Sequence, residues 1–308
     1  MDKPKDQTRS LRKPKALKPG GTLGVIAPAG RVDSSLLHKG LSRLETLGYK
    51  IILGKHLEKA SRFFAGTDKE RAEDVQAMLL NPEVDAVLCA RGGVGAARMI
   101  PHLDLKALAQ TPKIFVGLSD ITSVLLYMNK VLGWVSFHGP MAATQFGGEH
   151  SPLLEEHFFR ILEGELLAMC YDSVSTLRPG QAEGRLTGGC LTLICTTIGT
   201  PYEIDTRDKI LFIEDINEAP FRIDRLLSYL KMLGKFEGIR GLVFGQMPQC
   251  SPDTLPEIIL DIVGESRIPI LFGFPSGHGD SLATLPFGIN VRLDADTGTL
   301  TLLEAAVE

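Results

Sequence analysis

Three side chains that could together hydrolyse an acyl bond stand far apart in the sequence: Ser119, Glu214 and His278. Each of them follows an apolar run typical of a strand. A serine nucleophile needs a neighbouring base, and a histidine oriented by a carboxylate can supply one. Because such triads occur in several chain orders, the order serine, glutamate, histidine is compatible with this chemistry.

Ser119 lies at a break between an expected strand and an expected helix. Residues 113–118 form an apolar run, Gly117 permits a tight turn, and apolar residues recur at helical spacing over 121–128. A serine at such a corner projects its hydroxyl from the sheet edge, where the first N–H groups of the helix favour negative charge. The alternative is that Ser119 only caps the helix, since its spacing differs from the G-x-S-x-G of the usual nucleophile elbow.

The base and its carboxylate also have alternatives. His278 lies between two glycines in a loop after an apolar strand, where catalytic groups are frequent, whereas most of the other histidines fall in helices or polar loops. Glu214 ends an apolar strand and could orient a partner or be a solvated strand end. Three nearby carboxylates compete for the same role: Asp215, Glu218 and Asp224.

A glycine-rich turn at residues 91–95 follows a continuous apolar strand at 84–90. It lacks the G-x-G-x-x-G pattern and a P-loop lysine, and a nucleotide site remains an alternative interpretation. Gly92 and Gly93 would let their backbone N–H groups approach a small oxyanion. Arg91 and Arg222 are candidates for binding a terminal carboxylate, unless both form ordinary ion pairs.

Composition excludes several classes of function. The 308 residues carry a net charge of −4, with 44% hydrophobic and 23% charged residues, so we expect no nucleic-acid partner. We find no apolar run long enough to cross a membrane. The seven histidines show no metal-binding spacing, and we expect neither metal nor organic cofactor. The five cysteines contain no C-x-x-C and indicate free thiols in a reducing, cytoplasmic compartment.

Alternating strands and helices predict an α/β fold whose first part is a Rossmann-like parallel sheet, with ligands at the carboxyl ends of its strands. Residues 1–20 are basic and proline-rich and are expected to form a loose arm rather than a secretory signal. We expect a nucleophile domain over 21–150, a linker over 151–183 and a smaller, β-rich, barrel-like domain over 184–308. Residues 184–190 are expected to enter a helix that runs through Ile198.

Taken together, these motifs resemble the LD-carboxypeptidases, a serine peptidase family that also contains the microcin C self-immunity peptidases. The resemblance covers nearly the whole chain from residue 22. The matching stretches are RFFAGTDKERAEDV (62–75), ARGGVGAARMI (90–100), GLSD (117–120), FHGPM (137–141), LTGG (186–189), IGTP (198–201), LFIEDINEAPFRIDR (211–225) and GHG (277–279). The loop APAG departs from it, because we would expect a serine near Ala29, and residues 1–20 have no counterpart.

The resemblance implies roles for five residues. Ser119 would be the nucleophile, His278 the general base and Glu214 its orienting carboxylate, while the N–H groups of Gly93 and Asp120 would form the oxyanion hole. The implied activity is that of a muramoyltetrapeptide carboxypeptidase, which removes the terminal D-alanine from muropeptide tetrapeptides in cytoplasmic cell-wall recycling. It also implies a homodimer that binds a small peptide.

Two other functions remain open. The same triad could hydrolyse peptidyl- or aminoacyl-nucleotides, which would call for an aromatic side chain that stacks on a base. Trp134 is the only tryptophan, and its position favours core packing. The chain could also be a non-catalytic protein that binds a small ligand, with Ser119 as a helix cap.

Overall fold

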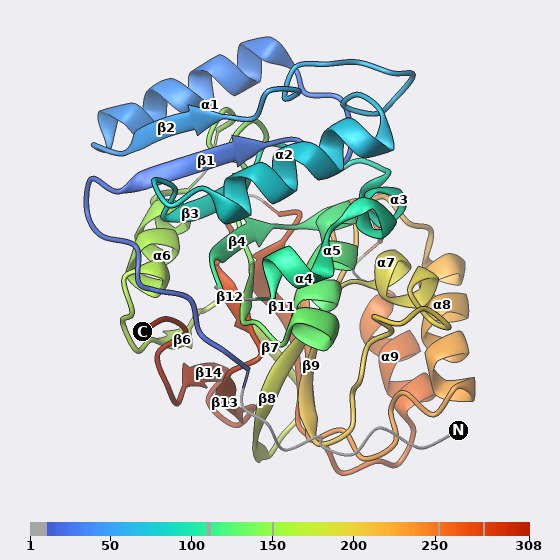
Figure 1. Ribbon diagram of the computed structural model, residues 1–308. Coiled ribbons are helices and arrows are strands. Elements are labelled where there is room, and N and C mark those ends of the chain that lie inside the picture. The colour runs from blue at the N-terminus through green and yellow to red at the C-terminus, as the bar shows by residue number, and fades with distance from the viewer. Residues whose placement is uncertain (1–10, 110–111, 150, 252, 280) are drawn as a thin grey trace.

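The computed structural model describes residues 11–109, 112–149, 151–251, 253–279 and 281–308 (Figure 1). Two sheets form the body of the protein. The first has the strand order β12-β5-β4-β3-β1-β2, in which every neighbouring pair is parallel except β12 with β5. Its strands are β1 (Thr22–Ile26), β2 (Lys50–Leu53), β3 (Ala86–Cys89), β4 (Ile114–Gly117), β5 (Ser136–His138) and β12 (Leu285–Phe287).

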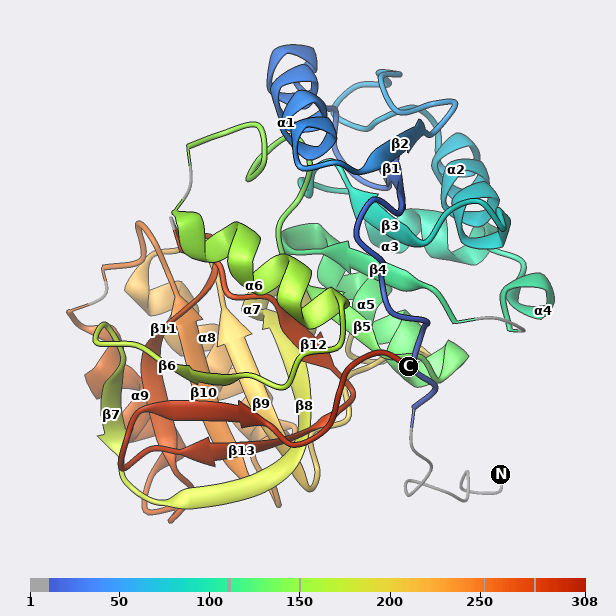
Figure 2. The same cartoon turned by 90° about the vertical axis from the view of Figure 1, so that its left-hand side faces the viewer.

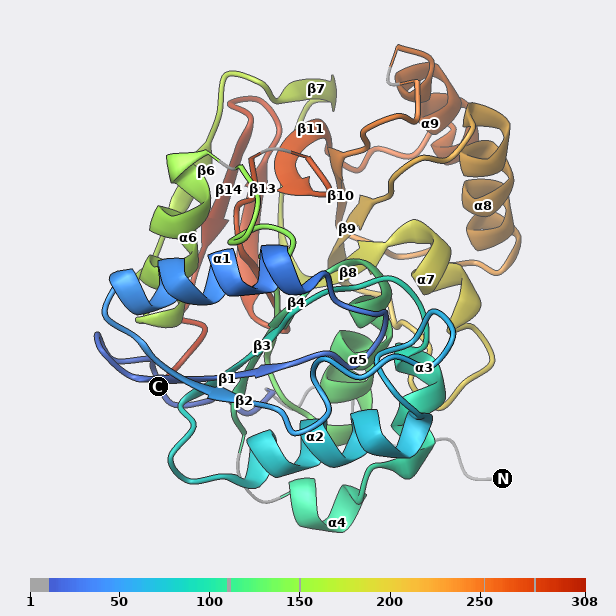
Figure 3. The ribbon, with the colours of Figure 1, turned by 90° about the horizontal axis from the view of Figure 1, so that it is seen from above.

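Helices cover both faces of this sheet, with α1 on one face and α2 and α4 on the other (Figure 3). Local signals set where they begin: Asp33 caps α1 by accepting a bond from the Leu36 N–H, and Thr67 and Glu70 form a capping box at α2. The helices are α1 (Ser34–Thr46), α2 (Asp68–Leu80), α3 (Ala96–Met99), α4 (Leu105–Leu108), α5 (Thr122–Tyr127) and α6 (Pro152–Leu162). Short turns η1 (Ile100–His102), η2 (Ser119–Ile121) and η3 (Met128–Leu132) complete this part.

The second sheet has the order β6-β14-β13-β8-β9-β10-β11-β7, with parallel pairing only from β8 to β11. It curls so that β13 and β14 lie in front of β9 and β10 in Figure 2. The expected mixed α/β class with a second, β-rich part is confirmed. The strands are β6 (Ala168–Cys170), β7 (Ser175–Arg178), β8 (Gln181–Cys190), β9 (Lys209–Glu214), β10 (Gly241–Gln246), β11 (Ile270–Gly277), β13 (Asn290–Asp294) and β14 (Thr299–Leu302); the helices are α7 (Leu191–Thr196), α8 (Pro220–Met232) and α9 (Leu255–Val263).

The stretch 184–190 confirms one expectation in part. It forms the end of a strand, β8, and leads as expected into a helix, α7, which begins at Leu191 and ends at Thr196 rather than at Ile198. Gly188 and Gly189 have φ values of +149° and +133°, and a Cβ built on Gly188 would lie 1.9 Å from the carbonyl oxygen of Phe212 on β9. Glycine therefore allows β8 and β9 to approach closely here.

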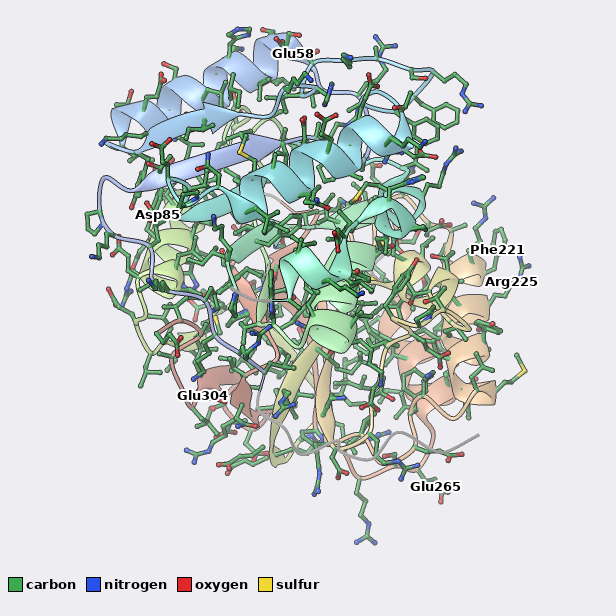
Figure 4. All side chains as sticks on the ribbon, in the orientation of Figure 1. Glu58, Asp85, Phe221, Arg225, Glu265 and Glu304 are labelled. Atoms are coloured by element: carbon green, nitrogen blue, oxygen red, sulfur yellow. The ribbon has the colours of Figure 1, made fainter. Side chains whose placement is uncertain are left out.

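The expectation of a loose N-terminal arm is wrong for residues 11–20, because they pack against the body of the protein. The Leu17 N–H donates to the Leu162 carbonyl at 2.9 Å, and the Leu17 side chain is buried. Lys13 pairs with Glu304 at 2.7 Å, near the C-terminus (Figure 4). Apolar burial and backbone pairing outweigh the basic composition that suggested disorder. Residues 1–10 lie outside the described residues.

The boundaries of the expected domains stay a prediction, although the segment expected as a linker contains α6, β6 and β7. One hydrophobic cluster contains side chains of both sheets, including Phe137 and Phe287 from the first sheet and Phe212 from the second, and another packs α7, α8 and α9 against the second sheet. Within the described residues, no helix is both long and apolar enough to cross a membrane.

Candidate active site

Ser119 stands at a strained corner just after β4. Its φ is +66°, in the left-handed region that non-glycine residues rarely adopt and that is frequent at functional sites. Its side chain is partly exposed, although Leu118 and Asp120 are buried. Helix α5 begins only at Thr122, and among the described residues no side chain caps it. The cap interpretation of Ser119 therefore lacks the hydrogen bond on which it depends.

The glycine-rich turn lies against this serine. A Cβ built on Gly92 would be 2.7 Å from the Ser119 Cβ and 3.0 Å from its Oγ, so only glycine leaves room at position 92. Gly93 has a φ of +100°, and the Gly30 N–H donates to the Gly92 carbonyl at 2.8 Å, which fixes the turn. The structure thus brings residues 91–95 to the nucleophile candidate, while the oxyanion roles of the Gly93 and Asp120 N–H groups stay predictions.

The Asp120 side chain has a structural role that the sequence did not reveal. Its Oδ2 accepts a bond from the Ala96 N–H, the first residue of α3, at 2.7 Å. Burial raises the pKa of Asp120 to about 6, and the bond from Ala96 and the charge of Arg71 oppose this rise. Asp120 therefore ties the serine corner to α3, and its type and spacing gave no signal of that bond.

His278 and Glu214 form the second half of the site. The His278 Nδ1 lies 2.6 Å from the Glu214 Oε2, and the Glu214 side chain is fully buried. Of the competing carboxylates, Asp215 accepts bonds from the N–H and hydroxyl of Thr192, at 2.9 and 2.8 Å. The structure therefore resolves the choice among these residues in favour of Glu214 as the partner of His278.

The pair is electrostatically coupled. Burial by itself would lower the pKa of His278, but the charge and hydrogen bond of Glu214 outweigh it, so the pKa lies above its usual value. Burial likewise raises the pKa of Glu214, against the opposing charge of His278. A hydrogen bond from Nδ1 leaves the Nε2 of His278 free to accept a proton, which is the arrangement of a general base.

Contacts between elements bring the two halves together. The Cys190 N–H at the end of β8 donates to the Thr122 Oγ1 at the start of α5, at 3.1 Å, and Cys190 is paired with Glu214 across β8 and β9. Within the described residues no hydrogen bond joins Ser119 to His278. Catalytic hydrogen bonds are often long in unliganded enzymes, and this contact of the triad stays a prediction.

His138 is a buried neighbour that sequence reasoning missed. His138 ends β5, and among the described residues neither of its ring nitrogens has a hydrogen-bond partner. Burial, and then the charge of His278, lower its pKa to about 3, so it stays neutral beside the site. Its apolar neighbour Phe137 was the one available signal of burial.

The remaining candidates lie in different surroundings. Arg91 is exposed, and its guanidinium donates to the Arg31 carbonyl at 2.5 Å. Arg222 is exposed on α8, close in sequence to Phe221 and Arg225 (Figure 4), and pairs with Glu218 at 3.4 Å. Trp134 is fully buried, so it offers no free face for stacking on a base. In the described part of the chain, no three metal-ligating side chains gather as a metal site would require.

Comparison with known proteins gives consistent matches along the chain. Residues 23–139 match the family of the LD-carboxypeptidase N-terminal domain, and residues 183–293 match the LD-carboxypeptidase C-terminal domain. A relative from Bacillus subtilis strain 168, named probable murein peptide carboxypeptidase, is 40% identical over 304 residues, covering 96% of this chain and 95% of its own.

Two solved structures show the same architecture. MccF in complex with glutamyl sulfamoyl guanosine matches with a TM-score of 0.91 and 25% identity, over 96% of this chain and 99% of its own. The muramoyltetrapeptide carboxypeptidase from Oxalobacter formigenes matches with a TM-score of 0.81 and 30% identity, over 91% and 97%.

Proposed function

The chain belongs to the LD-carboxypeptidase family of peptidases, and from this premise we propose that it is a serine enzyme that removes the terminal D-alanine from muropeptide tetrapeptides. The observation that carries the proposal is the buried Glu214–His278 pair, tied by the Thr122–Cys190 bond to a strained serine corner. We further propose that it acts in the cytoplasm, as a homodimer, on small peptides.

In the proposed reaction, His278 takes the Ser119 proton through Nε2 while the serine oxygen attacks the carbonyl before D-alanine. The N–H groups of Gly93 and Asp120 hold the oxyanion, and loss of one such donor typically costs about 10²–10³ in turnover. The imidazolium, stabilised by Glu214, then protonates the departing amine. Water, activated by His278, hydrolyses the acyl-enzyme and restores the free serine.

A second candidate is hydrolysis of an aminoacyl- or peptidyl-nucleotide by the same residues. The likeness to MccF, solved with glutamyl sulfamoyl guanosine, favours it. Burial of Trp134 counts against it, because that side chain cannot stack on a base. The name of the Bacillus subtilis relative supports the muropeptide instead.

The test is mass spectrometry of a diaminopimelate-containing tetrapeptide incubated with wild type, Ser119→Ala and Ser123→Ala. Ser123 is a matched control, because its hydroxyl is buried and, among the described residues, has no hydrogen-bond partner. We expect loss of one D-alanine with wild type and Ser123→Ala only. If wild type leaves the peptide intact, the muropeptide proposal is wrong, and aminoacyl-nucleotides are the next substrates to try.

Covalent labelling separates an enzyme from a non-catalytic binding protein. An acylating reagent should modify Ser119 in wild type, and the reaction should be lost in His278→Ala because no base remains. Equal labelling of both proteins, or none of either, would support the binding-protein interpretation.

A further inference from the structure

A hollow of about 430 Å³ opens beside Gly93, and three arginines line it: Arg31, Arg62 and Arg91. Each arginine belongs to a loop at the carboxyl edge of the first sheet, after β1, β2 and β3 respectively. These strands are neighbours in the sheet, and β3 adjoins β4, which leads to Ser119. In Figure 3 the loops after β1 and β2 come together next to α3. The hollow is connected to the nucleophile through the glycine-rich turn, because Gly93 lines the hollow and the adjacent Gly92 lies against Ser119.

Hydrogen bonds fix the walls of this hollow. The Arg31 N–H donates to the Phe63 carbonyl at 3.1 Å, and the Gly30 N–H donates to the Gly92 carbonyl at 2.8 Å. Beneath them the buried Arg71 donates to the carbonyls of Pro28 and Gly95 at 2.7 and 2.6 Å. The three loops are thus held in place before any ligand arrives, which reduces the entropy lost on binding.

The guanidinium groups of Arg62 and Arg91 have only uncharged partners: Arg62 lies over the rings of Phe63 and Phe64, and Arg91 donates one bond to the Arg31 carbonyl. Within the described part of the chain, no carboxylate forms an ion pair with Arg31, Arg62 or Arg91. The one acidic residue of the wall, Asp33, already accepts the Leu36 N–H at 3.0 Å as the cap of α1. Other exposed arginines are paired, namely Arg98 with Asp68, Arg240 with Asp208 and Arg292 with Glu183. Unpaired guanidinium groups in a fixed concavity suit a carboxylate.

We propose that this hollow is a carboxylate subsite for the substrate, formed by Arg31, Arg62 and Arg91 together. The proposal rests on the proposed function and extends it. Gly93 belongs both to the hollow and to the expected oxyanion hole, so the bound carboxylate is close to the scissile bond. In a diaminopimelate tetrapeptide, two carboxylates meet this condition: that of the terminal D-alanine and that of the diaminopimelate side chain.

The test is steady-state kinetics with Arg31→Gln, Arg62→Gln and Arg91→Gln. Arg267→Gln is the matched control, an exposed arginine that lines a different hollow. We expect each of the three variants to raise KM about tenfold, the lower end of what a charge-assisted hydrogen bond contributes, with kcat nearly unchanged. Arg91→Lys, which keeps the positive charge, should raise KM less than Arg91→Gln does.

Two amidated peptides identify the carboxylate, one ending in D-alaninamide and one with an amidated diaminopimelate side chain. With the peptide that lacks the recognised carboxylate, the KM of wild type should rise to the level of the arginine variants. The arginine substitutions should then cause no further increase in KM for that peptide. KM values equal to wild type in all three variants would overturn the proposal. Arginine variants that raise KM as much with both amidated peptides as with the parent peptide would also overturn it, because their effect would then not depend on a substrate carboxylate.

Binding separates this proposal from the proposed function. Calorimetry of the tetrapeptide with Ser119→Ala, and with Ser119→Ala combined with Arg91→Gln, needs no turnover. If wild type releases no D-alanine, the proposed function is wrong, and the subsite is judged by this measurement alone. About tenfold weaker binding to the double variant supports the subsite, and equal binding overturns it.

Discussion

Two buried carboxylates raise the pKa of His278, and Glu214 has a larger effect than Asp215. Glu214→Gln keeps the size of the side chain but removes the charge that holds this pKa above its usual value. The pKa of His278 should then fall, so the neutral imidazole persists to lower pH. We expect the acid limb of kcat/KM to move to lower pH, and kcat to drop by on the order of 10²–10⁴ because the imidazolium loses its partner.

A pH–rate profile of wild type and Glu214→Gln measures this effect. Asp215→Asn is the graded comparison, because Asp215 also raises the pKa of His278 but does not bond to it. Its acid limb should move in the same direction by a smaller amount. An acid limb that stays in place in Glu214→Gln would show that His278 is not the group titrating.

For single residues, the sequence indicated which side chains could be catalytic better than it indicated which of them contact each other. A serine at a strand–helix corner and a histidine between glycines are recognisable by type, and the structure brings His278 onto Glu214. Residue types alone could not separate Glu214 from Asp215, since both lie at the end of the same apolar strand. Adjacent strand residues point to opposite faces, and only the tertiary structure shows which face holds the histidine.

Among the elements, the link between α5 and β8 sets how the serine corner lies relative to the base. Thr122→Val would leave the Cys190 N–H without its acceptor in a buried place. We expect a loss of about 1–3 kcal/mol in the free energy of unfolding. We also expect kcat to fall while KM changes little, because the spacing of the reacting groups would change rather than the binding of the peptide.

Urea unfolding together with steady-state kinetics tests this link. Thr122→Ser is the matched control, since it keeps the hydroxyl and should retain most of the stability and activity. Wild-type stability and kcat in Thr122→Val would show that the bond positions neither element.

The elements themselves were predictable where periodicity was clear. Apolar spacing located α1 and α2, and the continuous apolar runs located β3 and β4, both fully buried. Periodicity did not indicate β8, because Gly188 and Gly189 interrupt the apolar pattern of that strand. Their purpose is close approach to Phe212 on β9 and to Thr122, which local sequence cannot show.

In the whole molecule, β12 connects the loop that carries His278 to the first sheet. After β11 and His278 the chain returns to the first sheet, where β12 pairs antiparallel with β5 and Leu285 stands opposite His138. This crossing holds the histidine loop near the serine edge. The sequence does not indicate this crossing, because a three-residue strand that pairs with residues about 150 positions earlier leaves no local pattern.

This crossing predicts that the protein unfolds as one unit. Phe287 on β12 is fully buried, with its ring centroid 5.6 Å from His138 on β5 and 6.4 Å from Phe212 on β9. Phe287→Ala should therefore lower the free energy of unfolding by about 3–5 kcal/mol, as in other large-to-small core substitutions. In calorimetry we expect a single transition that moves as a whole to lower temperature, since both sheets share the lost contacts.

Phe221→Ala, at a side chain 61% exposed on α8, is the control and should change stability by less than about 0.5 kcal/mol. Two transitions, of which only one responds to Phe287→Ala, would show that the sheets fold independently and that the site is assembled by docking rather than by a common core.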